Sequence, residues 1–248
     1  LQGQPEAISA GVCSFDTINQ AVAAVIDTIQ MGLPMARIEF IDAATVAAVN
    51  QYSSAGLPEL PHLLVEFHGS EAGVAEQSET FGLIVAEHDA HDFKWATQAE
   101  DRSALWKMRH TAYYAVLASH PGAGAMVTDI CVPISKLADA VEQTSAEINQ
   151  SSIAGPIMGH VGDGNFHAIL MIDPEKPDDL KTAKDLSERM VTRALEMGGT
   201  ATGEHGIGVG KLNYMAQEHG HGWTVMSSIK RALDPLDIMN PGKLLRQN

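Results

Sequence analysis

Two kinds of apolar pattern alternate along the first half of the chain. Short apolar runs are each followed by a segment whose apolar residues recur every three or four positions. The first pattern is typical of strands and the second of helices. Strands are therefore expected at 11–15, 36–41, 62–67 and 93–96. Helices are expected at 16–29, 42–50, 70–88 and 98–117, and Asp16, Asp42 and Ser70 are the predicted N-caps of the first three.

The second half continues with a strand over 126–132, a helix from Pro133 to residue 148 and a hairpin around 160–167. A long helix over 176–197, a glycine-rich segment and two short helices near 212–218 and 223–233 follow. None of the strands is the long Val/Ile run typical of a doubly wound parallel sheet. The fold class predicted is α+β, with an antiparallel sheet covered by helices.

Composition narrows the possible classes of protein. A length of 248 residues fits one large domain or two small ones, and 45% hydrophobic residues suit a packed core. The apolar runs are far shorter than the roughly 18 residues of a membrane span, and no secretory leader is recognised. Only two cysteines occur, far apart, which favours a reducing compartment without disulfides. The formal charge of −15 disfavours nucleic-acid binding and draws attention to each arginine near a candidate site.

One short stretch, 160–167, carries two histidines beside a Gly-Asp-Gly-Asn turn. If Gly162 to Asn165 form the loop of a hairpin, His160 and His167 are directly opposed. Opposed side chains share one face of a sheet, so two imidazoles could reach one metal ion. The turn composition alone also explains the stretch, and two histidines with a purely structural role remain the alternative.

A second stretch, 203–208, reads Gly-Glu-His-Gly-Ile-Gly. Its glycine spacing fits neither a phosphate-binding loop nor a dinucleotide-binding loop. Glu204 could complete a two-histidine, one-carboxylate set for Zn²⁺, Mn²⁺ or Fe²⁺. His205, its neighbour, is not expected to turn toward the same ion and would be free to act as a base. The alternative is a flexible connector with a surface Glu and His.

Other histidine pairs, at 88 and 91 and at 219 and 221, stand at predicted helix ends and are interpreted as solvated. On the helix over 98–117, Arg109 shares a face with Trp106 and Tyr113. Such a trio could present a guanidinium, backed by an aromatic ring, to a carboxylate. The alternative is an inward-packed Trp106 with Arg109 in water.

These motifs occur together and in order, and Met-Asn-Pro-Gly-Lys follows at 239–243. In this combination, and in the stretches 36–41, 66–69 and 128–133, the chain resembles the C-terminal part of FAD-linked 2-hydroxy-acid dehydrogenases. These enzymes belong to the vanillyl-alcohol oxidase superfamily, and the chain is most similar to the cytochrome-linked D-lactate dehydrogenases. The resemblance covers nearly all of the sequence and implies an FAD-linked oxidase C-terminal fold with ferredoxin-like elements.

The resemblance also implies roles for individual residues. The implied ligands of a divalent metal are His160, His167 and Glu204. The implied substrate-binding residues are Arg109, Tyr113 and His205, with Arg109 on the substrate carboxylate. His205 is also the implied catalytic base, which takes the hydroxyl proton while hydride leaves C2 for the flavin.

The resemblance divides the protein as well. Residues 1–248 correspond to the substrate- and metal-binding domain, and the pyrophosphate-binding loops of an FAD domain are not found in them. FAD contacts are implied at His205 and Asn240, and the tail 234–248 would pack on that other domain. We therefore expect this chain alone to hold FAD weakly and to be inactive. The implied partners are a 2-hydroxy acid and a cytochrome or quinone acceptor, and a homodimer is allowed. The implied location is the bacterial cytoplasm, including the inner face of the membrane, or the mitochondrion of a eukaryote.

Substrate choice depends on two apolar residues, Val127 and Ile169. Relatives acting on D-2-hydroxyglutarate carry polar or basic side chains near these places. Apolar residues would leave a second carboxylate unpaired, so a short monocarboxylate such as D-lactate is expected. D-2-hydroxyglutarate and glycolate dehydrogenases are the alternatives within the family. A stand-alone metal-binding module and a metal-assisted hydrolase are the alternatives from other classes.

Overall fold

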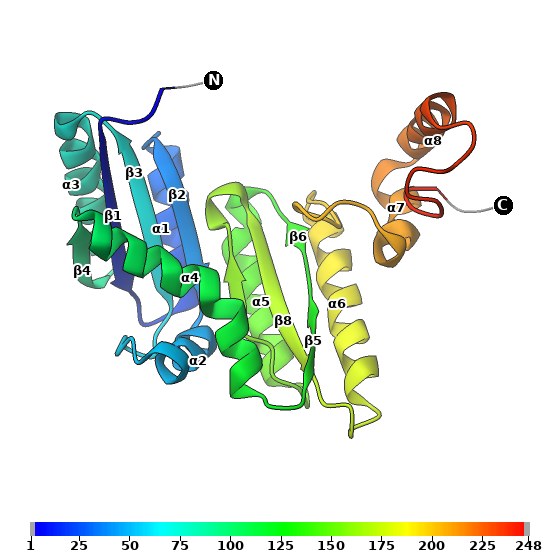
Figure 1. Cartoon of the computed structure of the whole chain (residues 1–248), viewed down its shortest axis with the longest axis horizontal. Coiled ribbons are helices and arrows are strands. Elements are labelled where there is room, and N and C mark those ends of the chain that lie inside the picture. The colour runs from blue at the N-terminus through cyan, green and yellow to red at the C-terminus, as the bar shows by residue number, and fades with distance from the viewer. Residues whose placement is uncertain (1–2, 246–248) are drawn as a thin grey trace.

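The computed structural model describes residues 3–245, which form an antiparallel sheet with helices on both faces (Figure 1). The strand order is β4-β1-β3-β2-β7-β8-β5, and β6 pairs with β8 beside this path. The strands are β1 (Ala7–Ser14), β2 (Met35–Ile41), β3 (His62–Gly69), β4 (His91–Ala96), β5 (Gly124–Val127), β6 (Ile130–Cys131), β7 (Ile157–Gly159) and β8 (Asn165–Ile172). The α+β class expected from the sequence is confirmed.

The helices divide between the two faces of the sheet. They are α1 (Ile18–Gln30), α2 (Ala43–Ser53), α3 (Glu71–Glu87), α4 (Ala99–Ser119), α5 (Leu137–Asn149), α6 (Asp179–Glu196), α7 (Met215–His219) and α8 (His221–Leu233). Helices α1, α3, α5 and α6 enclose the larger hydrophobic core with one face, and α2 and α4 enclose a second core with the other. Short 3-10 turns are η1 (Ile134–Lys136), η2 (Val161–Asp163) and η3 (Val209–Tyr214).

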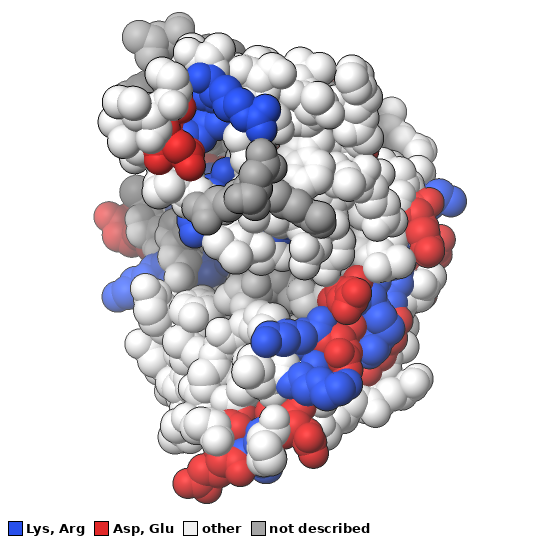
Figure 2. All heavy atoms as spheres, turned by 90° about the vertical axis from the view of Figure 1, so that its right-hand side faces the viewer, with Lys and Arg blue, Asp and Glu red and all other residues white. Residues whose placement is uncertain are grey.

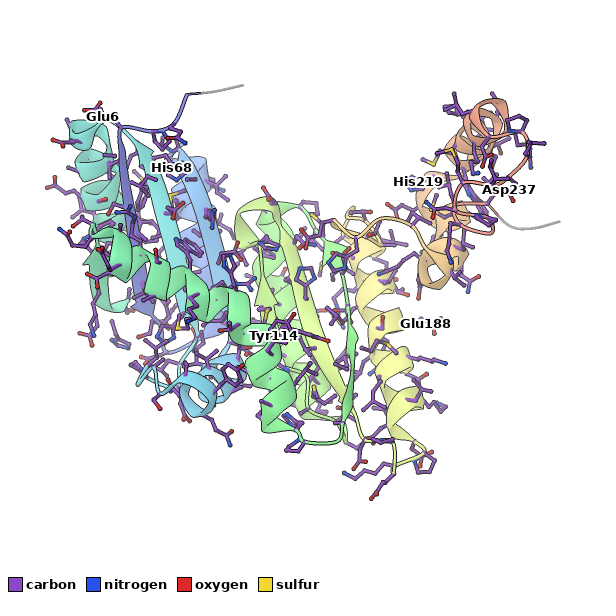
Figure 3. The ribbon with its side chains drawn as sticks, in the orientation of Figure 1. Glu6, His68, Tyr114, Glu188, His219 and Asp237 are labelled. Atoms are coloured by element: carbon purple, nitrogen blue, oxygen red, sulfur yellow. The ribbon has the colours of Figure 1, made fainter. Side chains whose placement is uncertain are left out.

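Along strand β3, successive side chains point alternately into the two hydrophobic cores. Leu63, Val65 and Phe67 enter the larger core, whereas Leu64 enters the second core. Glu66 points to the same face as Leu64, because side chains alternate along a strand. Helices α2 and α4 cover only part of that face, and the upper end of β3, where Figure 3 labels His68, stands clear of them. Glu66 is nevertheless buried on this face.

Most predicted boundaries hold within a few residues, but the first cap is wrong. Helix α1 is capped by Thr17, whose Oγ1 accepts from Gln20 N at 3.2 Å while Gln20 Oε1 accepts from Thr17 N at 3.0 Å. This reciprocal capping box leaves Asp16 free to bond His91 at 2.9 Å instead. The caps predicted at Asp42 and Ser70 are confirmed by bonds from Thr45 N and Gly73 N.

The predicted strand over 126–132 is broken into β5 and β6, and Thr128 and Asp129 lie between them. Thr128 N still donates to Ala168 O at 3.0 Å, but Ala168 N donates to the Thr128 hydroxyl at 2.8 Å. A side chain therefore takes the place of a backbone carbonyl in the ladder. The Thr128 carbonyl becomes available for another donor.

The hairpin register also differs from the expected one. Met158 is the partner of His167 in the ladder, so His160 lies beyond the end of β7 rather than opposite His167. The turn contains η2 and is closed by Gly164 at φ 78°, and Asn165 is already part of β8. At Gly159 an added Cβ would lie 2.6 Å from Phe166 Cα, so only glycine permits this close approach of the strands.

The C-terminal helices form a unit that stands away from the sheet (Figure 1). The labelled His219 and Asp237 lie in this unit, at the opposite end of the molecule from Glu6 (Figure 3). Its exposed apolar side chains include Val225, Ile229 and Leu233 of α8. On the face of the molecule seen in Figure 2, acidic and basic side chains mix in the lower half and much of the upper surface carries no charge. The predicted tail over 234–248 follows α8, and its residues 246–248 lie outside the described residues.

Within residues 3–245, no helix combines the length and the apolar character that crossing a bilayer requires.

Candidate metal and substrate site

Each of the two motif histidines has its Nδ1 atom bound to an oxygen that can only accept. His160 Nδ1 lies 2.7 Å from Glu39 Oε1, and His167 Nδ1 lies 2.9 Å from the Thr128 carbonyl oxygen. The carbonyl is the one released by the broken ladder. Since a carboxylate and a carbonyl require a donor, the proton of each ring sits on Nδ1. The Nε2 lone pairs are left for a metal ion.

Both Nε2 atoms face Glu204. Its Oε1 lies 3.5 Å from His160 Nε2 and 3.4 Å from His167 Nε2, and ligand atoms of the three residues lie within 4.8 Å of one another. These separations exceed normal hydrogen bonds. They match the roughly 3.3–3.5 Å between neighbouring ligand atoms of a tetrahedral zinc site with bonds of about 2.0–2.2 Å. The three side chains therefore fit a divalent ion.

Asp129 holds the segment that carries Glu204. Its Oδ2 accepts from the backbone N–H groups of Glu204 at 3.1 Å and His205 at 3.0 Å, and from Thr202 Oγ1 at 2.9 Å. Its Oδ1 accepts from Asn165 Nδ2 at 2.8 Å. Burial opposes ionisation of Asp129, but these hydrogen bonds outweigh it and hold its pKa well below the usual range. The ionised carboxylate thereby fixes the loop position.

Gly203 and Lys211 complete this attachment. An added Cβ at Gly203 would lie 1.7 Å from Asn165 Nδ2 and 2.8 Å from Asp129 Oδ1, so the close approach requires glycine. Lys211 Nζ donates to the Asp129 carbonyl at 2.9 Å and to the carbonyl of Ala201. Burial lowers the pKa of this lysine. The glycine-rich segment is thus tied to the strand break rather than being a loose connector.

His205 lies on the open side of the cluster. Its Nε2 is 3.3 Å from Glu204 Oε1, and its side chain is 55% exposed compared with 8% for His167. The group of potential metal ligands contains Glu204 but not His205, although the two side chains lie closer together than the sequence suggested. The tight loop bends both side chains toward the two motif histidines.

Arg109 meets the cluster through a residue that the sequence did not single out. Its Nε and Nη2 donate to Glu39 Oε2 at 3.2 and 2.9 Å, and Nη1 lies 3.5 Å from Met158 Sδ. Trp106 was expected to pack behind Arg109. Instead, the guanidinium of Arg37 lies over the Trp106 ring, 4.9 Å from the ring centroid. The sequence did contain a signal that could have identified Glu39. Arg37 and Glu39 are charged residues on one face of a strand that is otherwise apolar.

The other predicted residues lie at different distances from the cluster. Tyr113, one turn after Arg109, packs on the second core and on Tyr114, with ring centroids 5.5 Å apart. Val127 and Ile169 are direct partners between β5 and β8, with Val127 exposed and Ile169 buried. Asn240 lies in the separate C-terminal unit, where its carbonyl accepts from Lys243 N at 3.2 Å.

Three histidines of the other predicted pairs, His88, His91 and His219, have carboxylate partners of their own. His88 Nε2 lies 2.7 Å from Asp27, His91 Nε2 lies 2.9 Å from Asp16, and His219 Nε2 lies 3.6 Å from Glu218. Residues 3–245 contain one group of potential metal ligands, the one at His160, His167 and Glu204.

Comparison with known proteins agrees with this architecture. The profile described as "FAD linked oxidases, C-terminal domain" matches residues 4–244, and the chain belongs to this family. The 4-ethylphenol oxidase of Gulosibacter chungangensis has the same fold. It aligns with a TM-score of 0.72 at 16% identity over 98% of this chain and 55% of its own.

Relatives with higher sequence identity are known from several organisms. A probable mitochondrial D-lactate dehydrogenase of Danio rerio is 44% identical over 99% of this chain and 50% of its own length. A mitochondrial D-lactate dehydrogenase [cytochrome] of Arabidopsis thaliana is 40% identical over 99% of this chain and 43% of its own. The glycolate oxidase subunit GlcD of Bacillus subtilis is 30% identical over 100% of this chain and 53% of its own. The chain thus spans about half the length of these relatives.

Proposed function

We propose that this chain is the substrate- and metal-binding domain of an FAD-dependent D-2-hydroxy-acid dehydrogenase that acts on D-lactate. The observation that carries the proposal is the convergence of His160, His167 and Glu204 beside His205, in a member of an FAD-linked family. The D-lactate dehydrogenase names of the Danio rerio and Arabidopsis thaliana relatives support the choice of reaction.

The side chains have distinct roles in this reaction. When bound, a divalent Zn, Mn or Fe ion would polarise the substrate hydroxyl, and FAD would accept the hydride from C2. His160, His167 and Glu204 hold the ion. His205, exposed and next to Glu204, takes the hydroxyl proton, a role suited to imidazole near neutral pH. Loss of one proton and one hydride converts the 2-hydroxy acid to the 2-oxo acid.

Arg109 anchors the substrate carboxylate. Glu39 occupies the Nε–H and one N–H of Nη2, and one N–H of Nη1 is directed to Met158 Sδ. The second N–H of Nη2 and the second N–H of Nη1 are left for a substrate carboxylate. Tyr113 follows one turn later on the same helix and lines the substrate side with it.

Substrate size is set on the β5–β8 side. Val127 and Ile169 face each other across the ladder and offer no partner to a second carboxylate. This favours D-lactate over D-2-hydroxyglutarate. Glycolate, named for the Bacillus subtilis relative, is the alternative of similar size.

The complete protein would hold FAD mainly through a domain outside this chain. His205 and Asn240 contribute from this side, and the tail 234–248 packs on that domain. The exposed Leu236, Ile238 and Met239 support such packing. The names of the relatives favour a cytochrome as electron acceptor, with a quinone as the alternative, and a mitochondrial location in a eukaryote. In a bacterium the proposed location is the cytoplasm, including the inner face of the membrane. A homodimer is the proposed oligomeric state.

Metal analysis of the purified chain tests the site. Wild-type protein should bind about one Zn²⁺ or Mn²⁺ per chain, and His160→Ala and His167→Ala should abolish tight binding. His91→Ala, which removes a histidine paired with Asp16, is the control and should bind as wild type does. Equal metal content in all four proteins would remove the site from the proposal.

Turnover is tested with D-lactate and a dye acceptor, with and without a separately produced FAD domain. Activity that requires both parts and prefers D-lactate to D-2-hydroxyglutarate and glycolate is expected. Reduction of the dye in the absence of flavin would contradict the flavin-dependent reaction. Metal binding without any flavin-dependent turnover would leave a stand-alone metal-binding module.

A further inference from the structure

We propose that Glu39 is a positioning residue of the metal site, which orients His160 and joins it to Arg109. The inference rests on the proposed function, because it assigns a role toward the metal that His160, His167 and Glu204 would hold. Glu39 itself lies on β2 and is not one of the converging ligands.

Each oxygen of Glu39 has its own partner. Oε1 lies 2.7 Å from His160 Nδ1, and Oε2 accepts from Arg109 Nε and Nη2 at 3.2 and 2.9 Å. The Glu39 side chain is 11% exposed, so water competes little for these bonds. Bonds between buried ionic groups are stronger than neutral ones and have defined geometry.

His160 depends on this contact more than His167 does. His167 is part of β8, is buried, and bonds to a carbonyl held by the sheet. His160 lies outside the ladder, at φ −86° and ψ 69° before η2, and its side chain is 38% exposed. Its ring is therefore oriented chiefly by Glu39. A carboxylate on Nδ1 fixes the ring rotation and makes Nε2 a better ligand.

The same carboxylate connects the metal side to the substrate side. Arg109, the proposed carboxylate anchor, and His160, the proposed ligand, share one buried acceptor and have no other common partner among the hydrogen bonds of residues 3–245. Moving or removing Glu39 therefore disturbs both groups at once. Substrate binding at Arg109 and metal binding at His160 are coupled through it.

The neighbouring strand provides a matched comparison. Glu66 on β3 is buried to a similar extent and also lies between an arginine and a histidine, with Arg37 Nε at 3.6 Å and His68 Nε2 at 2.8 Å. It faces the same side of the sheet as Glu39, since Arg37 is its partner in the ladder. Its histidine is not part of the metal group. Glu66→Gln thus reproduces the loss of a buried carboxylate without touching the site.

The test measures Zn²⁺ affinity of the purified chain by competition with a chromogenic chelator. Glu39→Gln and Glu39→Asp should bind Zn²⁺ about 10- to 100-fold more weakly than wild type. Glu66→Gln should retain wild-type affinity. Thermal unfolding in chelator shows which variants fold, and Glu39→Asp, which keeps the charge, provides the test if Glu39→Gln does not fold.

A second readout does not depend on metal at all. In ¹⁵N NMR spectra of the metal-free chain near pH 8, wild-type His160 should carry its proton on Nδ1. Glu39→Gln should shift this tautomer population while leaving His167 unchanged. Wild-type affinity together with an unchanged His160 tautomer in the Glu39 variants would overturn the inference. If wild type binds no Zn²⁺, the metal site of the proposed function fails, and the tautomer measurement still decides the role of Glu39.

Discussion

The imidazole rings of His167 and His205 lie parallel, with their centroids 5.3 Å apart and an angle of 7° between their planes. One ring is buried in the sheet and bonded through Nδ1, and the other lies at the surface of the glycine-rich loop. In the proposed function the buried ring of His167 would be a metal ligand, and the exposed ring of His205 would meet the substrate. The different environments of the two stacked rings thus suit the different roles proposed for them, metal ligand for His167 and base for His205.

Replacing His205 should therefore affect turnover more than metal binding. In the complete gene product, His205→Ala should lower kcat with D-lactate by about 10²–10⁴-fold, the usual contribution of a general base. Zn²⁺ affinity of the chain should stay near the wild-type value. Loss of metal from His205→Ala would show instead that His205 is a ligand, as its 3.3 Å distance from Glu204 Oε1 also allows.

Arg109→Lys should raise the KM for D-lactate by roughly 10- to 100-fold, since it removes one charge-assisted hydrogen bond worth about 1.5–3 kcal/mol. Lysine keeps the positive charge but lacks the planar fork that serves Glu39 and the substrate together. Steady-state kinetics with D-lactate provide the measurement, and Arg102→Lys near the start of α4 is the control. A KM equal to that of wild type would remove Arg109 from the substrate site.

Gly203→Ala should destabilise the chain by about 1–3 kcal/mol and weaken metal binding, because the new methyl group displaces Asn165 from Asp129. Gly208→Ala is the matched control in the same segment, since an added Cβ there has no neighbour within 4 Å. Urea unfolding in chelator and Zn²⁺ titration measure the two effects. Similar behaviour of the two variants would contradict the attachment of the loop described above.

His62 should make stability depend on pH. It is buried at the start of β3, and burial lowers its pKa more than the bond to the Leu60 carbonyl raises it. The unfolded chain therefore binds more protons than the folded one as pH falls through the unperturbed value. The free energy of unfolding should decrease from about pH 7.5 to pH 5.5. This decrease should be smaller in His62→Gln. His110→Gln, which changes an exposed histidine, is the control and should behave as wild type. Equal pH dependence of the free energy of unfolding in all three proteins would contradict the assignment to His62.

Much of the fold could be predicted because it is local. Periodicity found each helix of the main body within a few residues, and short-range caps such as Asp42 follow from residue type. The cap of α1 was missed because Asp16 and Thr17 are both good caps. The choice of Thr17 depends on Gln20 and on His91, which is distant in sequence.

The convergence of His160, His167 and Glu204 could be predicted from the sequence, but its geometry could not. Motif spacing identified His160, His167 and Glu204, although the assumed register was wrong. They converge because a 3-10 turn and a strand break place them, and neither is encoded by a simple pattern. Two further contacts join strands and helices that are distant in sequence. Glu39 binds His160, and Arg37, rather than the expected Arg109, lies over the ring of Trp106. The charges at 37 and 39 in an apolar strand mark these two residues in the sequence, but they do not show which partners the residues contact.

The strand break at Thr128 has a consequence for how the proposed metal site would respond to an ion. Because the Thr128 hydroxyl replaces its own carbonyl in the ladder, the bond to His167 is part of the sheet and does not depend on occupancy. Asp129, the next residue, accepts a hydrogen bond from the backbone N–H of Glu204 and so holds the loop that carries it. The site is thus preorganised by the framework. Metal capture should require little rearrangement, and the entropy cost of assembling the ligands is met when the chain folds.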